Sequence, residues 1–79
     1  MISPEQIKSW IEVGLACEHV EVQGDGHHFE AVIVSAAFRG KSRVQQHQMV
    51  YSALGGRMRA EIHALSMQTF TPEDWARHG

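Results

Sequence analysis

The side chains with the most chemical potential in this 79-residue sequence are its six histidines. Three of them fall in two short stretches: His27 and His28 in "GDGHHFEAVIVS", and His63 in "EIHALSMQT". A neutral imidazole ligates zinc, iron or copper. Two such ligands are too few for a closed structural zinc site, which takes four. The sequence therefore predicts at most half of a metal site, completed by a partner.

The ordinary alternative is that these histidines are hydrogen-bonded residues at the rim of a sheet. They converge only if their two strands are close in space at one end of that sheet. His47 repeats at helical spacing with neighbouring valines, which favours a residue at the edge of the core. His78 is close to the last residue of the sequence, and we expect it to be mobile. The residues alone leave both interpretations of His27, His28 and His63 open.

The sequence contains little that would support nucleophilic catalysis. Cys17 is the only cysteine, so it forms no internal disulfide and no Cys-rich site by itself. It is expected just past a helix C-terminus, where the helix dipole disfavours a thiolate. The "GDG" and "GG" stretches lack the Lys-Ser/Thr pair of a phosphate-binding loop. We expect no enzyme.

The charge balance bears on nucleic-acid binding. A formal net charge of -2 argues against a protein held to nucleic acid mainly by phosphate contacts. Two local basic groups remain as an alternative nucleic-acid surface: Arg39, Lys41 and Arg43, then Arg57 and Arg59. The same residues could equally be the solvated rim of a loop and a helix start.

The composition is typical of one small globular domain covering residues 1–79. "MISPEQIKSW" has no basic region followed by an apolar run, so no secretory signal is expected. No apolar stretch approaches the roughly 20 residues that span a bilayer. We therefore expect a cytoplasmic protein with no membrane partner.

Local signals define the expected elements. Ser3, Pro4 and Gln6 predict the start of a helix that extends to about Ala16. Alternation predicts a strand over residues 19–23, followed by a glycine-rich turn. The near-continuous apolar run over residues 29–35 predicts a second strand, central in the sheet or buried on both faces.

The second half of the chain repeats these signals. Ser42 is a helix cap, Gly55 and Gly56 stop the helix, and an apolar stripe lies between them. The predicted stripe consists of Val44, His47, Val50, Tyr51 and Leu54. Residues 57–61 are a helical turn or a loop, and residues 62–69 are a strand. Thr71 and Pro72 begin a short last helix anchored by Trp75.

The expected order is α-β-β-α-(α)-β-α. The connection from the second strand to the third carries a helix, so these strands run parallel if they are neighbours, with a right-handed crossover. We predict an α+β fold with a three-stranded mixed sheet and helices mainly on one face.

At this point the residues resemble the BolA family, and the short "GDGxHF" hairpin is similar to its IbaG-type bacterial branch. The resemblance extends from about Ile7 to Arg77. It rests on the histidine-phenylalanine pair that opens the second strand, Phe38-x-Gly40, Val50, "IHA" and Thr71-Pro72-x-x-Trp75. It implies a fold related to the class II KH type, although "GGRM" lacks the second glycine of a KH loop.

The resemblance also implies a function. Members of the family pair with monothiol glutaredoxins, and the complex can hold a [2Fe–2S] cluster. In that arrangement the glutaredoxin contributes a cysteine, glutathione a second thiolate, and the BolA partner a histidine. The matching residue here is His63, and either His28 or His27 occupies the position of a second ligand in the loop. The resemblance thus implies a non-enzymatic adaptor in iron–sulfur homeostasis and stress response, with no cofactor in the isolated chain.

The alternative that the resemblance offers is a DNA-binding transcriptional regulator. Positions that are often basic in relatives are Gln45 and Gln46 here, and the net charge is negative. DNA is therefore the second expected partner, after glutaredoxin. We expect a monomer when the chain is alone, with a homodimer as the alternative.

Overall fold

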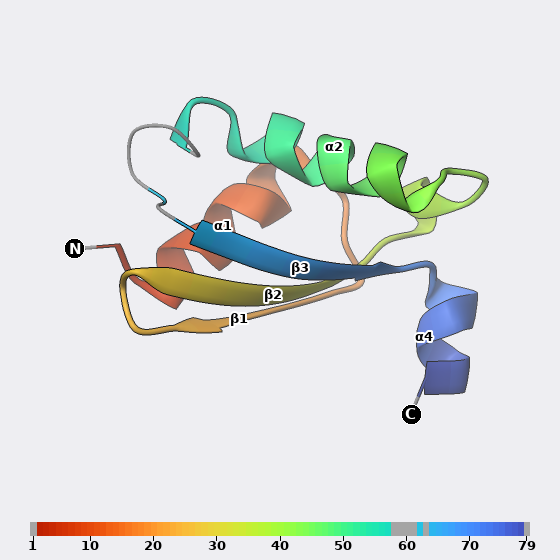
Figure 1. Ribbon diagram of the computed structural model, residues 1–79. Coiled ribbons are helices and arrows are strands. Elements are labelled where there is room, and N and C mark those ends of the chain that lie inside the picture. The colour runs from red at the N-terminus through yellow and green to blue at the C-terminus, as the bar shows by residue number, and fades with distance from the viewer. Residues whose placement is uncertain (1, 58–61, 63, 79) are drawn as a thin grey trace.

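The computed structural model describes residues 2–57, 62 and 64–78. Its elements follow one another in the order shown in Figure 1. They are α1 (Pro4–Gly14), β1 (His19–Gly24), β2 (His28–Val34), the 3₁₀ helix η1 (Ala36–Phe38), α2 (Arg43–Leu54), β3 (Ala64–Phe70) and α4 (Pro72–His78).

The three strands form one sheet in the order β1-β2-β3. β1 and β2 are an antiparallel hairpin, and β2 and β3 are parallel. α1 and α2 cover one face of this sheet, and α4 follows the carboxyl end of β3 (Figure 1). The predicted α+β fold with a three-stranded mixed sheet is therefore confirmed, and β2 takes the predicted central position.

Both long helices begin with the same capping device. Gln6 N–H donates to Ser3 Oγ at 3.2 Å, while Ser3 N–H donates to Gln6 Oε1 at 2.8 Å. Ser42 and Gln45 repeat this arrangement at the start of α2 with the same two distances, 3.2 and 2.8 Å. Each cap satisfies backbone donors that a helix start leaves unpaired, which stabilises the fold by about 1 kcal/mol.

The core lies between the sheet and the two long helices. Its largest fully buried side chains are Phe29, Phe38, Ile7, Ile11, Ile33 and Leu54. One polar residue, Ser35, is also fully buried, and its hydroxyl donates to Ala16 O at 2.6 Å and accepts from Ala37 N at 3.1 Å. Because these bonds satisfy the hydroxyl, its burial carries little penalty.

Three local expectations need correction. α1 ends at Gly14 and not near Ala16, at a point where a Cβ would lie 2.8 Å from the Cα of Ala53 on α2. The predicted stripe of α2 is only half right, because Val44 is 66% and Tyr51 41% exposed. η1 was not predicted at all.

α4 is held by a group of stacked rings. The Trp75 ring stacks on His19 of β1, with centroids 5.2 Å apart, and on His78 at 5.3 Å. Phe70 contacts both Trp75 and His78. His78 thus contacts the rings of Phe70 and Trp75 while its side chain stays exposed.

Cys17 follows α1 in a half-buried position, and its Sγ lies 3.3 Å from Leu15 O. Burial first, and then the negative charge of Glu12, raise the pKa of this thiol. We expect iodoacetamide to alkylate Cys17 several-fold more slowly than it alkylates glutathione at the same pH, because less thiolate is present. Mass spectrometry measures the rate. Urea-unfolded protein is the control, in which the difference should disappear; equal rates in the folded protein would contradict the prediction.

Among the described residues, no helix combines the length and the apolar character needed to cross a membrane.

Candidate functional site

The histidine pair occupies the turn of the β1–β2 hairpin. Asp25 organises this turn, because its Oδ1 accepts hydrogen bonds from the backbone N–H groups of both His27 and His28 at 2.9 Å. Gly26 follows with a φ of 98°, a conformation that glycine adopts without strain. The hydrogen bonds from His28 and His27 lower the pKa of the Asp25 carboxyl group. The carboxylate therefore holds the backbone of both histidines in one conformation.

The sheet register relates this turn to the start of β3. His28 is the first residue of β2, and its pairing partner in β3 is Ala64, the residue that follows His63 in the sequence. His63 itself lies outside the described residues. On its other side, Ile62 is 3% exposed, and its N–H donates to Arg57 O at 2.9 Å. The hairpin turn and the beginning of β3 therefore lie at the same end of the sheet (Figure 1).

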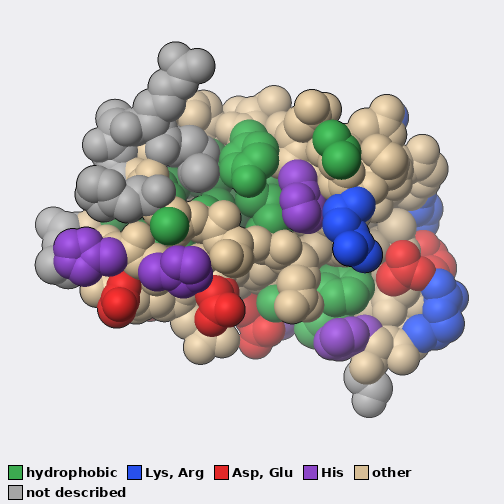
Figure 2. Space-filling view, viewed as in Figure 1, with side chains coloured by type: hydrophobic (Ala, Val, Ile, Leu, Met, Phe, Trp, Pro, Cys, Tyr) green, Lys and Arg blue, Asp and Glu red, His purple; other side chains and the backbone are tan. Residues whose placement is uncertain are grey.

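The side chains of His27 and His28 are exposed at this end. Figure 2 shows histidine side chains on the surface there, with carboxylates beside them. Within the described part of the chain, no group of three or more His, Cys, Asp and Glu side chains could hold a metal ion. An exposed imidazole is nevertheless a suitable nitrogen donor for iron. The exposed imidazoles of His27 and His28 are therefore suited to a metal site whose other ligands come from another molecule.

The other described histidines lie elsewhere. His19 pairs with Val34 at the opposite end of β2, and its Nε2 lies 3.3 Å from Glu21 Oε2. His47 is half-buried on α2, beside a groove next to β3. Neither is near the hairpin turn in sequence or register, so neither joins the candidate site.

The described basic residues of the predicted surface lie at the two ends of α2. Arg39 forms a two-pronged ion pair with Glu73, with N–O distances of 2.9 and 2.5 Å, which lowers the pKa of Glu73. Arg57 lies beyond the other end of α2, with its guanidinium 4.6 Å from the Trp10 ring centre. The 12 residues of α2 separate the two groups by about 18 Å along the helix.

The other basic residues of the predicted nucleic-acid surface do not connect its two ends. Lys41 and Arg43 are exposed around the start of α2. Arg59 lies outside the described residues. A surface built on the described arginines would therefore need to bridge the length of α2.

Sequence reasoning missed the role of Asp25. An aspartate that precedes glycine in a turn commonly accepts hydrogen bonds from backbone N–H groups two or three residues ahead. That signal is present in "GDGHH" and identifies Asp25 as the residue that positions the pair. The Arg39–Glu73 pair is different, because 34 residues separate its members and no local pattern connects them.

Comparisons with known proteins agree on one family. The family model for BolA-like proteins matches residues 9–74. The acid stress protein IbaG of Escherichia coli (strain K12) is 40% identical over 73 residues, which cover 91% of this chain and 87% of the relative. The DNA-binding transcriptional regulator BolA of Haemophilus influenzae is 44% identical over 57 residues, which cover 72% of this chain and 55% of the relative.

A solved structure shows the same architecture. A BolA protein homologue from Coxiella burnetii superposes with a TM-score of 0.90 at 46% identity, and the match covers 98% of this chain and all of that one. This agreement includes the class II KH-like arrangement of helices around a mixed sheet. The chain therefore belongs to the BolA family and is similar to its IbaG members.

Proposed function

We propose that this protein is a non-enzymatic adaptor that pairs with a monothiol glutaredoxin and helps to hold a [2Fe–2S] cluster between them. His63 and one residue of the His27–His28 pair would be its ligands. The observation that carries the proposal is the register of β2 and β3, in which His28 pairs with Ala64, the sequence neighbour of His63.

The surroundings of the pair support a shared site. Both histidines of the turn are exposed, so a partner can reach them. Asp25 holds their backbone by two hydrogen bonds, which limits the conformational freedom lost when a ligand binds. Exposed imidazoles on a backbone that is held in place suit a complex that forms and separates.

The chemistry of imidazole adds a second argument. A histidine ligand in place of a thiolate raises the reduction potential of an iron–sulfur cluster, as in Rieske centres. An imidazole also stops ligating when it is protonated, so the contribution of this chain should weaken as the pH falls. A histidine donor thus makes the shared site sensitive to acid.

The test is to mix the protein with a monothiol glutaredoxin, iron, sulfide and glutathione, and to record the visible absorption and circular dichroism of the heterodimer. We expect His63→Ala to abolish the spectrum of the shared cluster. Only one of His27→Ala and His28→Ala should reduce it strongly, because one residue of the pair is expected to be a ligand. Which of the two does so identifies the loop ligand.

His78→Ala is the matched control, because His78 is exposed on α4, away from the hairpin turn. It should leave the spectrum unchanged. The melting temperature of each variant separates loss of a ligand from loss of folding. An unaltered cluster spectrum in His63→Ala would show that His63 is not a ligand.

DNA binding is the second candidate, and it is favoured by the name of the Haemophilus influenzae relative. The separation of Arg39 and Arg57 by α2, and the ion pair that already engages Arg39, weigh against it. Sequence-specific binding at physiological salt, with a steep salt dependence, would support this candidate over the adaptor.

A further inference from the structure

β3 is an edge strand over its described length. The sheet order β1-β2-β3 gives β3 one neighbour, β2, along its inner side. A strand at the edge of a sheet presents backbone N–H and C=O groups that can pair with another extended segment. The outer side of β3 is therefore a possible template for an added strand.

One hydrogen bond shows which backbone groups face outward. Ser35 N–H donates to Phe70 O at 3.0 Å, so the carbonyl of Phe70 points inward, toward the β2 side. Backbone groups alternate in direction along a strand, and both groups of one residue point to the same side. Gln68 therefore also faces β2, while the backbone groups of Met67 and Thr69 face the outer edge.

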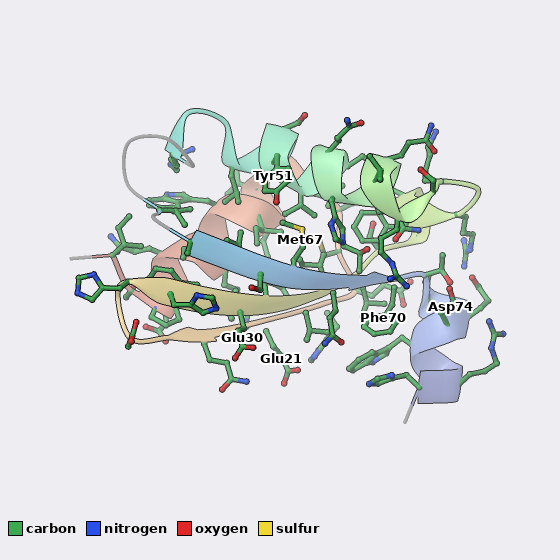
Figure 3. All side chains as sticks on the ribbon, in the orientation of Figure 1. Glu21, Glu30, Tyr51, Met67, Phe70 and Asp74 are labelled. Carbon is green, nitrogen blue, oxygen red and sulfur yellow. The ribbon has the colours of Figure 1, made fainter. Side chains whose placement is uncertain are left out.

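A groove runs beside this edge. It has a volume of about 350 Å³ and lies between α2 and β3. Its lining residues are Arg43, His47, Met67, Gln68, Thr69 and Phe70. Figure 3 labels Met67 and Phe70 along β3, below α2. The groove thus combines an edge strand with one wall made by a helix.

The charged residues that line the groove indicate what kind of segment it could bind. Arg43 is exposed, and none of the six lining residues carries a carboxylate. By contrast, Arg39 and Arg77 are engaged by Glu73 and Asp74. Figure 2 shows a basic side chain next to a histidine side chain between α2 and β3, with carboxylates beyond them toward α4. The groove is therefore complementary to a negatively charged segment.

His47 lies beside Arg43 in the lining of the groove. Its Nε2 atom is buried and has no hydrogen-bond partner among the described residues. His47 follows Arg43 by one helical turn on the same side of α2, so both residues line the groove, although the buried Nε2 atom itself is closed to an incoming segment.

We propose that the groove between α2 and β3 binds an extended acidic segment of a partner protein, which adds a strand to the outer edge of β3. Met67 and Thr69 supply the backbone pairing, and Arg43 contacts an acidic side chain of the segment. Strand addition beside a helix is an established mode of peptide recognition. The proposal does not depend on the cluster site at the hairpin end.

A second copy of this chain fits the groove poorly. In a symmetric dimer formed through β3, the same patch of both copies would meet. Such a dimer would bring together two copies of a lining that contains Arg43 and no carboxylate, so neither copy supplies the negative charge that would complement this lining. These observations favour an acidic segment of another protein.

The test uses three capped hexapeptides: Thr-Val-Glu-Val-Thr-Val, the same peptide with lysine in place of glutamate, and one with proline at that position. NMR spectra of the isotopically labelled protein report binding. We expect the glutamate peptide to shift the amide signals of Met67 and Thr69 and to slow their hydrogen exchange. The lysine peptide should bind more weakly, and the proline peptide should not bind.

Charge variants sharpen the result. Arg43→Glu should weaken binding of the glutamate peptide about five- to tenfold and strengthen binding of the lysine peptide, since attraction becomes repulsion. A glutamate in the first turn of α2 is compatible with the helix dipole, so the variant should fold. Lys8→Glu makes the same charge change on the exposed face of α1 and should leave binding unchanged.

Several results would overturn the proposal. These are equal affinity for the glutamate and lysine peptides, equal effects of Arg43→Glu and Lys8→Glu, and peptide shifts confined to β1. Concentration-dependent shifts of Met67 and Thr69 in the protein alone would assign the edge to a homodimer. The same shifts on addition of single-stranded DNA, without any effect of the peptides, would assign it to nucleic acid.

Discussion

Replacing Phe29 with alanine is expected to lower the free energy of unfolding by about 3–5 kcal/mol. Phe29 is fully buried in the core, and its side chain is among the largest with no solvent exposure. Its removal loses apolar burial and leaves a cavity that the surrounding helices and strands fill only in part. A chain of this length is expected to be stable by only about 4–12 kcal/mol, so this loss removes a large fraction of its stability.

Urea unfolding followed by circular dichroism measures this change. Val44→Ala is the control, because Val44 is 66% exposed on α2 and its truncation should change stability by less than about 0.5 kcal/mol. The comparison also tests the corrected pattern of α2. A loss at Val44 comparable with the loss at Phe29 would mean that the core is not where the structure places it.

Gly24→Ala should be the second most damaging substitution, with a loss of about 1–3 kcal/mol or more. A Cβ at this position would lie 2.4 Å from the carbonyl oxygen of His28 and 2.5 Å from Cδ1 of Phe29. Gly24 and Phe29 are paired across the hairpin, so the strands must separate to admit a methyl group. The displaced backbone belongs to His28, so the candidate ligand should move as well.

Gly56→Ala is the matched control, because no atom of the described residues lies within 4 Å of a Cβ built there and its φ is not in the left-handed region. Thermal unfolding of the two variants should therefore differ clearly. In the glutaredoxin reconstitution, Gly24→Ala should also reduce cluster formation, while Gly56→Ala should not. Equal stability of the two variants would contradict the close packing of the hairpin.

Local signals predicted most of the elements. Ser3 and Ser42 start the two long helices because their side chains satisfy the first backbone donors, which depends only on nearby residues. The hairpin likewise follows from "GDG" between two alternating stretches. The parallel direction of β2 and β3 could also be predicted, because strands joined by a helical crossover run parallel when they are neighbours.

The candidate site was only partly predictable. The histidines were visible as chemically capable residues, and Asp25 carries a turn signal that was present but missed. The sequence could not show whether the hairpin histidines and the start of β3 lie at the same end of the sheet. Pairing of His28 with Ala64 joins residues 36 positions apart, and it depends on how β2 and β3 align in the folded sheet.

By itself, the sequence determined where the two long helices and the last helix begin, which fold class the elements build, and which side chains could ligate a metal. The tertiary structure alone decided that Val44 and Tyr51 face solvent and that Trp75 stacks on His19. It also decided that the outer edge of β3 stands beside Arg43 and His47. The physical reason is that caps and turns are short-range interactions, whereas burial and contact depend on segments that meet only when the chain is folded.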